Sequence, residues 1–248
     1  MTIDKTRALV LNKTSYSNTS LVLIALTPDD GILSFIGKGF RKPPKRSWSP
    51  RDPIETFSEM EFTFYRSTTG LHSLSSATIL EQFPAIRTSY DNFVCAAFAA
   101  GLTLDMAGSS DACDYSLLKA FWKALRRTDD NCRLTLAYWL RSLRRAGFLP
   151  SLQYCSSCSN ELGKLATVAS NGAGLLCANC SRSGRDSLNR GDIMNARFLL
   201  ENRDIGKLEV RKASRKRLLN FLRIMTTTQV GRPPQLLDRV SKICDNIQ

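Results

Sequence analysis

The stretch from Cys155 to Cys180 decides the fold of the second half of this chain. It reads Cys155-Ser156-Ser157-Cys158, then eighteen further residues, then Cys177-Ala178-Asn179-Cys180. Each Cys-x-x-Cys pair places two thiolates on one tight turn. Two facing turns therefore supply four soft ligands at the corners of a tetrahedron, which is the geometry that Zn²⁺ accepts. The pattern predicts a zinc knuckle over residues 152–183.

Two alternatives remain for these cysteines. The pairs could form disulfides or simply pack as thiols, and a Cys-x-x-Cys at a strand-to-helix junction could be redox-active, although a redox motif needs no matching second pair. If a metal is bound, its ligands are Cys155, Cys158, Cys177 and Cys180. Four thiolates leave no open position on a zinc ion, so we expect a structural metal that carries out no chemistry.

The composition points to a polyanionic partner. The chain has 248 residues, 43% of them hydrophobic, which suffices for one large or two modest domains with cores. The net charge of +13 makes nucleic acid or an acidic membrane surface the first partner to consider. The first residues carry no apolar signal segment, and no run approaches the length of a membrane span. We therefore expect a cytoplasmic protein.

The remaining cysteines and the one histidine argue against an enzyme. We expect the four cysteines outside the pairs to be core or surface thiols; they are Cys95, Cys113, Cys132 and Cys244. His72 is the only histidine, and it lies in an alternating segment that predicts a half-exposed strand residue. A Ser-His or Cys-His catalytic pair would depend on this one side chain.

The first eighty residues carry strand signals. The expected strands are Arg7–Leu11, Leu21–Leu26, Ile32–Ile36, Thr56–Tyr65 and Leu71–Leu80. A five-residue turn that contains Pro28 and Gly31 joins the second and third strands as a hairpin. Five short strands suit a small closed β-barrel. We therefore expect a barrel domain at residues 1–81.

A basic loop between the third and fourth strands is the first predicted DNA contact. Its cations precede Asp52, the next acidic residue, and they are Lys38, Arg41, Lys42, Lys45, Arg46 and Arg51. Phe40 and Trp48 are interleaved with these charges. Cations beside aromatic faces form the single-strand-binding surface of an OB-type barrel, because they contact phosphates while the rings stack on bases. A solvated loop is the alternative.

After Pro84 the apolar spacing becomes helical. The candidate N-caps of three helices are Ser89, Asp114 and Asp130, and three later helical segments are Ile193–Leu200, Ser214–Met225 and Gln235–Ile243. We expect a helical domain over residues 82–248, with the knuckle inserted and with Trp122 and Trp139 in the core of a helical bundle. The expected fold class is α+β.

A second basic cluster opens the helix predicted near residue 214. It contains Arg211, Lys212, Arg215 and Lys216, followed by Arg217. Cations at the start of a helix are disfavoured by the helix dipole. We predict a second contact with DNA, and a solvated helix face is the alternative.

The order of these parts resembles the RecO family of DNA repair and recombination mediators. The resemblance rests on the strand Ala8–Leu11, the Lys38-Gly39-Phe40-Arg41 segment, the stretch Arg144–Pro150 that runs into the first cysteine pair, and Val230-Gly231-Arg232-Pro233. It covers nearly the whole chain. The segment Ser47–Asp52 departs from the usual glycine- and leucine-containing loop of the family.

The resemblance implies an OB-fold domain followed by a helical domain with a zinc knuckle, whose ligands carry over to the four cysteines of the two pairs. It also implies a non-enzymatic protein of the bacterial cytoplasm and nucleoid, which binds single- and double-stranded DNA and anneals complementary strands. With RecR, such a protein helps to load RecA onto DNA coated by the single-stranded-DNA-binding protein SSB. The C-terminal tail of SSB is bound by the helical domain in the family.

Two other functions compete with this interpretation. A zinc-bearing nuclease, ligase or deaminase is disfavoured, because no His-x-Glu accompanies a Pro-Cys-x-x-Cys and no carboxylate cluster suggests a two-metal site. The acidic pairs Asp29-Asp30 and Asp129-Asp130 lie where turns or caps explain them. The second competitor is a protein-interaction adaptor with a zinc ribbon, whose basic surface binds acidic protein tails.

Overall fold

The computed structural model describes residues 3–40, 53–68, 70–107, 114–169, 171–172, 174–181, 186–202 and 204–246. Contacts divide the chain into two compact units. One unit comprises Met1–Ser89 and Cys113–Arg126, and the other comprises Tyr90–Ala112 and Arg127–Gln248. The barrel unit thus takes in two helical segments from beyond residue 81, where the sequence predicted the domain to end.

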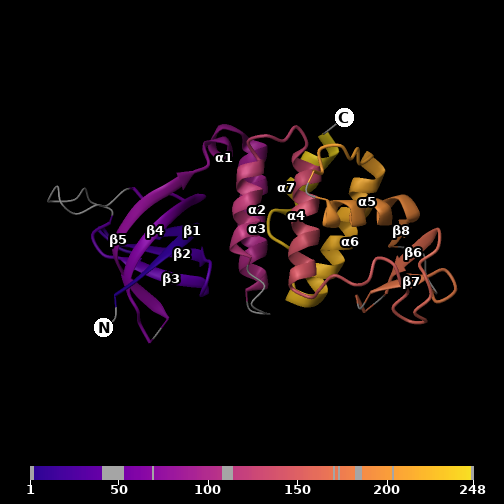
Figure 1. The fold of residues 1–248 in the computed structure, drawn as a ribbon, viewed down its shortest axis with the longest axis horizontal. Coiled ribbons are helices and arrows are strands. Elements are labelled where there is room, and N and C mark those ends of the chain that lie inside the picture. The colour runs from indigo at the N-terminus through magenta and orange to yellow at the C-terminus, as the bar shows by residue number, and fades with distance from the viewer. Residues whose placement is uncertain are drawn as a thin grey trace. The chain divides into compact units, whose positions relative to one another are not determined.

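Five strands build the first unit. They are β1 (Ile3–Ser15), β2 (Leu21–Thr27), β3 (Gly31–Gly37), β4 (Ser58–Tyr65) and β5 (Leu71–Gln82). The strands form a closed barrel in the order β1-β2-β3-β5-β4, in which β4 pairs back onto β1 (Figure 1). Every neighbouring pair is antiparallel except β3 and β5. All five predicted strands are present, and β1 is longer than predicted.

Aromatic side chains fill the interior of the barrel. The ring of Phe35 lies edge-on to Phe62 and to Phe64, with 5.1 Å between ring centroids in each pair. His72 also points inward and is only 5% exposed; its Nδ1 accepts a hydrogen bond from the backbone N–H of Ser67. The predicted half-exposed position of His72 is therefore wrong, and burial lowers the pKa of this imidazole.

Two helices belong to the barrel unit, α1 (Pro84–Thr88) and α3 (Tyr115–Ala124). Asp114 caps α3 as predicted, because its carboxylate accepts the backbone N–H of Leu117. The ring of Trp122 packs edge-on against Phe57 and Phe83, both in the same unit. The expectation that Trp122 lies in the core of the helical bundle is therefore wrong. An apolar stripe shows that one face of a helix is buried, but it does not show against which partner.

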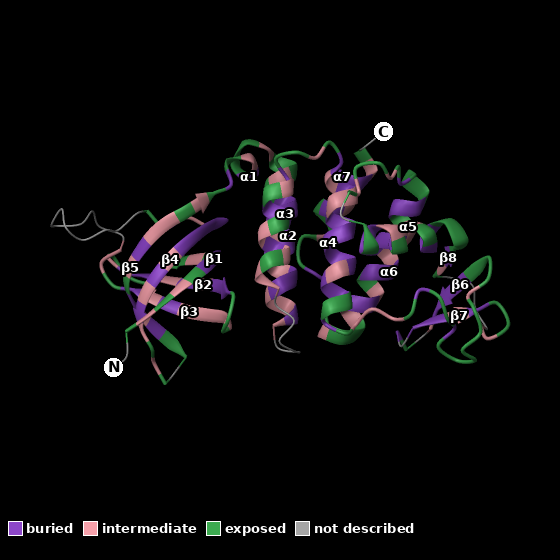
Figure 2. Cartoon of the chain, viewed as in Figure 1, coloured by how far each residue is buried: buried purple, intermediate pink, exposed green. Residues whose placement is uncertain are grey.

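The second unit is mainly helical. Its helices are α2 (Tyr90–Met106), α4 (Asn131–Arg145), α5 (Arg190–Glu201), α6 (Lys212–Val230) and α7 (Leu237–Asn246). Helix α4 contacts each of the other four, and its inward face is buried (Figures 1 and 2). Trp139 of α4 is fully buried beside Phe98, and its Nε1 donates a 2.8 Å hydrogen bond to Thr226 Oγ1 of α6. The predicted core position of Trp139 is confirmed.

A small sheet joins the helices to the cysteine-rich segment. It contains β6 (Leu165–Val168), β7 (Leu175–Cys177) and β8 (Ser187–Asn189), in the order β7-β6-β8. Asn189 ends β8 and forms a capping box with Asp192 of α5, which ties the sheet to that helix. Gly172 lies so close to α6 that a Cβ atom there would stand 2.1 Å from Thr228 Oγ1. None of the helices that the structure describes is long and apolar enough to cross a membrane.

Candidate metal centre and nucleic-acid interface

The four predicted metal ligands converge at one point. The Sγ atoms of Cys155, Cys158, Cys177 and Cys180 all lie within 4.8 Å of one another. Cys158 Sγ and Cys177 Sγ are 3.8 Å apart. Tetrahedral zinc with Zn–S bonds of about 2.3 Å places its sulfur ligands about 3.8 Å apart. The type and the spacing of these donors therefore fit a four-coordinate, thiolate-bound metal ion.

Backbone hydrogen bonds shape the two turns that carry the thiols. The N–H of Ser159 donates to the carbonyl of Cys155 (3.0 Å), and the N–H of Cys180 donates to the carbonyl of Cys177 (3.1 Å). The N–H of Ser156 donates to the carbonyl of Leu175, and this hydrogen bond joins the first turn to β7. Gly174 permits this approach, since a Cβ atom there would stand 1.9 Å from Ser156 Oγ. The protein fold therefore contributes to bringing the sulfurs together.

The electrostatic environment favours thiolate at one ligand. The backbone N–H groups of Cys177, Cys158 and Ser157 lower the pKa of Cys155 to about 6. Hydrogen bonds to Cys158 and Cys177 raise the pKa of Cys180 to about 12, because they stabilise its protonated thiol. Four sulfurs at these distances need protons or a cation between them to offset their mutual repulsion. A divalent metal ion would meet that need.

The predicted basic loop falls largely outside the described residues. Lys38 lies just beyond the end of β3 and is exposed. The other predicted DNA contacts of this loop lie outside the described residues; they are Arg41, Lys42, Lys45, Arg46 and Arg51. Cys113, one of the four cysteines outside the pairs, also lies outside the described residues. The contribution of this loop to DNA binding therefore stays a prediction from the sequence.

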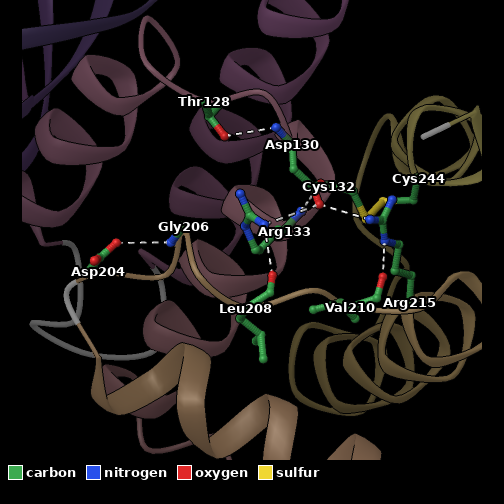
Figure 3. Close-up of polar contacts among 10 residues, drawn as sticks. All are labelled: Thr128, Asp130, Cys132, Arg133, Asp204, Gly206, Leu208, Val210, Arg215 and Cys244. Atoms are coloured by element: carbon green, nitrogen blue, oxygen red, sulfur yellow. Dashed lines mark hydrogen bonds and ion pairs between the residues drawn. A yellow bond between two sulfur atoms is a disulfide. The ribbon is translucent and has the colours of Figure 1, made fainter. Parts of the chain in front are cut away.

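The second basic cluster divides into two groups on α6. Arg211, Lys212 and Lys216 are exposed, and Lys216 Nζ lies 3.3 Å from Asp245 of α7. Arg215 points inward and is only 5% exposed. Its Nη2 donates to Asp130 Oδ2 at 2.9 Å (Figure 3). Arg215 therefore cannot contact a phosphate in this structure, and its predicted role in DNA binding does not fit its position.

A polar network surrounds Asp130, and no local sequence pattern predicts it. This carboxylate caps α4 through the N–H of Arg133 and also receives the guanidinium of Arg215. Arg215 and Arg133 in turn donate to the carbonyls of Val210 (2.6 Å) and Leu208 (2.8 Å), as Figure 3 shows. The network fixes the segment before α6 against α4. Only the helix cap of Asp130 could be predicted from neighbouring residues. Its pairing with Arg215 could not, because the two residues are separated by 85 positions.

A groove of about 440 Å³ lies between the base of the cysteine-rich segment and α5. Its apolar lining includes Leu152, Ile193 and Met194, and its cations are Lys164, Arg190 and Arg197. Met194 is 61% exposed, which is high for a large apolar side chain. Glu161 is the one acidic residue of this lining. Within the described part of the chain, the three cations form no ion pair, so the groove combines an apolar surface with an excess of positive charge.

Two of the cysteines predicted to be thiols are joined instead. Cys132 of α4 and Cys244 of α7 form a disulfide. Cys95 is a buried thiol as expected, and burial raises its pKa to about 11. The expectation for Cys132 and Cys244 is wrong because their pairing depends on the packing of α7 on α4, which brings together residues 112 positions apart.

Comparisons with known proteins give one consistent result. The family model "Recombination protein O N terminal" matches residues 1–83, and "Recombination protein O C terminal" matches residues 87–238. Three relatives are each named "DNA repair protein RecO". The protein of Rubrobacter xylanophilus is 28% identical over 73% of this chain and 72% of its own. Those of Heliobacterium modesticaldum and Clostridium acetobutylicum are 28% and 21% identical, over 85% and 98% of this chain and 79% and 99% of their own.

Proposed function

The chain belongs to the RecO family of DNA repair proteins, and from this premise we propose that it is a non-catalytic, DNA-binding recombination mediator. It binds single- and double-stranded DNA in the bacterial cytoplasm and anneals complementary strands. With RecR, it helps RecA to assemble on DNA coated by SSB. The N-terminal barrel serves as an OB-fold, and a structural Zn²⁺ is held by the four clustered cysteines.

The observation that carries the DNA-binding proposal is the group of exposed cations at the start of α6. Arg211, Lys212 and Lys216 lie outward where α6 begins, in a chain of net charge +13. Cations of this kind contact phosphates and release counterions, so binding depends on salt and little on base sequence. Annealing follows if one basic surface holds two strands close together, since it reduces the repulsion between their backbones and leaves base edges free to pair. No step of this mechanism needs a nucleophile.

Reversing three charges of the barrel loop tests its part in this surface. The variant Lys42→Glu/Lys45→Glu/Arg46→Glu should bind a single-stranded oligonucleotide more weakly. The negative slope of log affinity against log salt should become shallower by about 2. Each of the three lost phosphate contacts accounts for about 0.7 of that slope on single-stranded DNA. Fluorescence anisotropy over a series of salt concentrations measures both quantities. Lys207→Glu is the control, since Lys207 already pairs with Asp204. An unchanged slope would remove the loop from the DNA-binding surface.

The groove beside α5 favours a second, adaptor-like activity. Its apolar lining and unpaired cations suit a peptide that carries carboxylates beside large apolar side chains. We propose that this groove receives the C-terminal tail of SSB. Direct binding of a partner tail is compatible with DNA binding on α6, because the two surfaces use different cations.

Charge reversal in the groove separates these two activities. Lys164→Glu/Arg197→Glu should weaken binding of a labelled SSB-tail peptide about 10-fold or more, because attraction to carboxylates becomes repulsion. Its affinity for single-stranded DNA should change much less. Arg211→Glu/Lys212→Glu should give the opposite result. If the groove variant binds the peptide as tightly as the unaltered protein, the tail binds elsewhere.

A further inference from the structure

One helical unit holds two kinds of cysteine chemistry. Cys132 and Cys244 are joined by a disulfide, with 4.9 Å between their Cα atoms, a separation that natural disulfides adopt. The same unit carries the four clustered thiols, which must stay reduced to bind a metal. An environment that maintains such thiols also tends to reduce a disulfide. The Cys132–Cys244 pair can therefore be reduced to two thiols under the conditions that keep the four clustered thiols reduced.

We propose that Cys132 and Cys244 are a reversible redox pair, whose oxidation staples α7 to α4 and holds Asp245 beside Lys216. The disulfide cross-link between α4 and α7 is inferred from the positions of the two cysteines alone. Its functional consequence, a change in DNA affinity, rests on the DNA-binding function proposed above.

Access to the two sulfurs depends on movement of α7. Cys132 and Cys244 are 0% and 1% exposed, so no reagent reaches them while α7 is in place. Of the ten residues of α7, only Val240, Ile243 and Cys244 are buried. We expect a helix held by so few buried side chains to open at a lower free energy than the rest of its unit. Local opening of α7 therefore allows exchange without unfolding of the bundle.

The exchange reaction needs a small-molecule disulfide such as oxidised glutathione as its oxidant. The thiolate of one cysteine attacks this disulfide, forms a mixed disulfide and releases one small thiolate. The thiolate of the other cysteine then attacks the mixed disulfide, closes the Cys132–Cys244 bond and releases the second small thiolate. The protein loses two electrons and two protons, and the oxidant becomes two thiols. Excess small thiol reverses both steps.

The staple acts on a cation of the proposed DNA-binding surface. Asp245 follows Cys244 directly, and its carboxylate lies 3.3 Å from Lys216 Nζ. When the disulfide restrains the end of α7, this carboxylate stays close and offsets the positive charge of Lys216. Reduction allows the end of α7 to move away and leaves Lys216 available to a phosphate. The Asp130–Arg215 pair does not include α7, so α6 keeps its position on α4 in both forms.

The first experiment asks whether the pair is reversible. The full-length, metal-loaded protein is equilibrated with reduced or oxidised glutathione, its thiols are alkylated after denaturation, and peptides are identified by mass spectrometry. We expect Cys132 and Cys244 to be alkylated only after reduction. Oxidation should raise the Tm by about 10 °C, because the bond closes a loop of more than 100 residues. Cys132→Ala/Cys244→Ala should show no such shift. Two alkylated cysteines in every buffer, or a bond that excess thiol never opens in the folded protein, would overturn the proposal.

The second experiment measures single-strand affinity of both forms at low salt. The oxidised form should bind about two- to five-fold more weakly, since one exposed ion pair must be broken. Asp245→Asn should abolish this difference but keep the difference in Tm. Equal affinities of the two forms of the unaltered protein would overturn the link to DNA. If neither form binds DNA, the proposed function fails, while the alkylation and Tm results still decide whether the staple exists.

Discussion

Replacing Cys177 with serine is expected to abolish binding of the proposed zinc ion and to unfold the cysteine-rich segment. Metal binding at a structural site contributes directly to folding, by about 10–16 kcal/mol in small zinc-finger peptides. Cys177 is the last residue of β7, and the backbone N–H of Cys177 donates a hydrogen bond to Cys155 Sγ. Loss of this ligand would therefore remove the proposed metal ion and its cross-link between the two turns, and leave only backbone hydrogen bonds such as that from Ser156 N–H to Leu175 to hold them together.

Three measurements check this expectation. Elemental analysis of the unaltered protein, prepared without chelator, should give one zinc per chain, and Cys177→Ser should give far less. Hydrogen exchange should show lost protection in β6 and β7 but retained protection in α4. Cys95→Ala is the control, because Cys95 is a buried thiol that lies outside the cluster. Protein without bound metal, or a Cys177→Ser variant with unchanged exchange in β6 and β7, would contradict the metal assignment.

Features with a local signal were predicted well. Alternating strands, the caps of α3 and α4 and the convergence of the four cysteines each depend on residues close together in the sequence. The cysteine cluster needed only two tight turns and a reversal between them. The structure brings together all four predicted ligands for this reason.

Features that depend on which helices and strands pack against one another could not be predicted from the sequence. The apolar face of α3 packs in the barrel unit and not in the bundle, and His72 lies on the inward face of β5. Arg215 and Lys216 are adjacent and similarly charged, yet one is buried and the other exposed. At 3.6 residues per turn, Arg215 shares the inward face with Leu218 and Leu222. Helical periodicity could have separated the two cations, but nothing local paired Arg215 with Asp130.

Replacing Arg215 with alanine is expected to lower the free energy of unfolding by about 3 kcal/mol, the low end for breaking a buried ion pair, because Asp130 keeps only its longer 3.9 Å pair with the Arg133 guanidinium. Asp130 is 6% exposed and would keep its cap on α4 but lose its 2.9 Å contact with the guanidinium. The carbonyl of Val210 would lose its donor as well. Urea denaturation followed by circular dichroism measures the loss.

Lys216→Ala is the matched control, since its ion pair with Asp245 is largely exposed and pairs of this kind contribute no more than about 1 kcal/mol. The comparison also separates folding from DNA contact. Arg215→Ala should leave the DNA affinity of the remaining folded protein nearly unchanged, whereas Arg211→Glu/Lys212→Glu should weaken DNA binding without a change in stability. Replacing both partners, as Asp130→Ala/Arg215→Ala, should cost less than the sum of the single changes, because neither charge is then left buried alone. If Arg215→Ala is as stable as Lys216→Ala but binds DNA poorly, Arg215 contacts DNA after all and the buried ion pair does not hold α6 on α4.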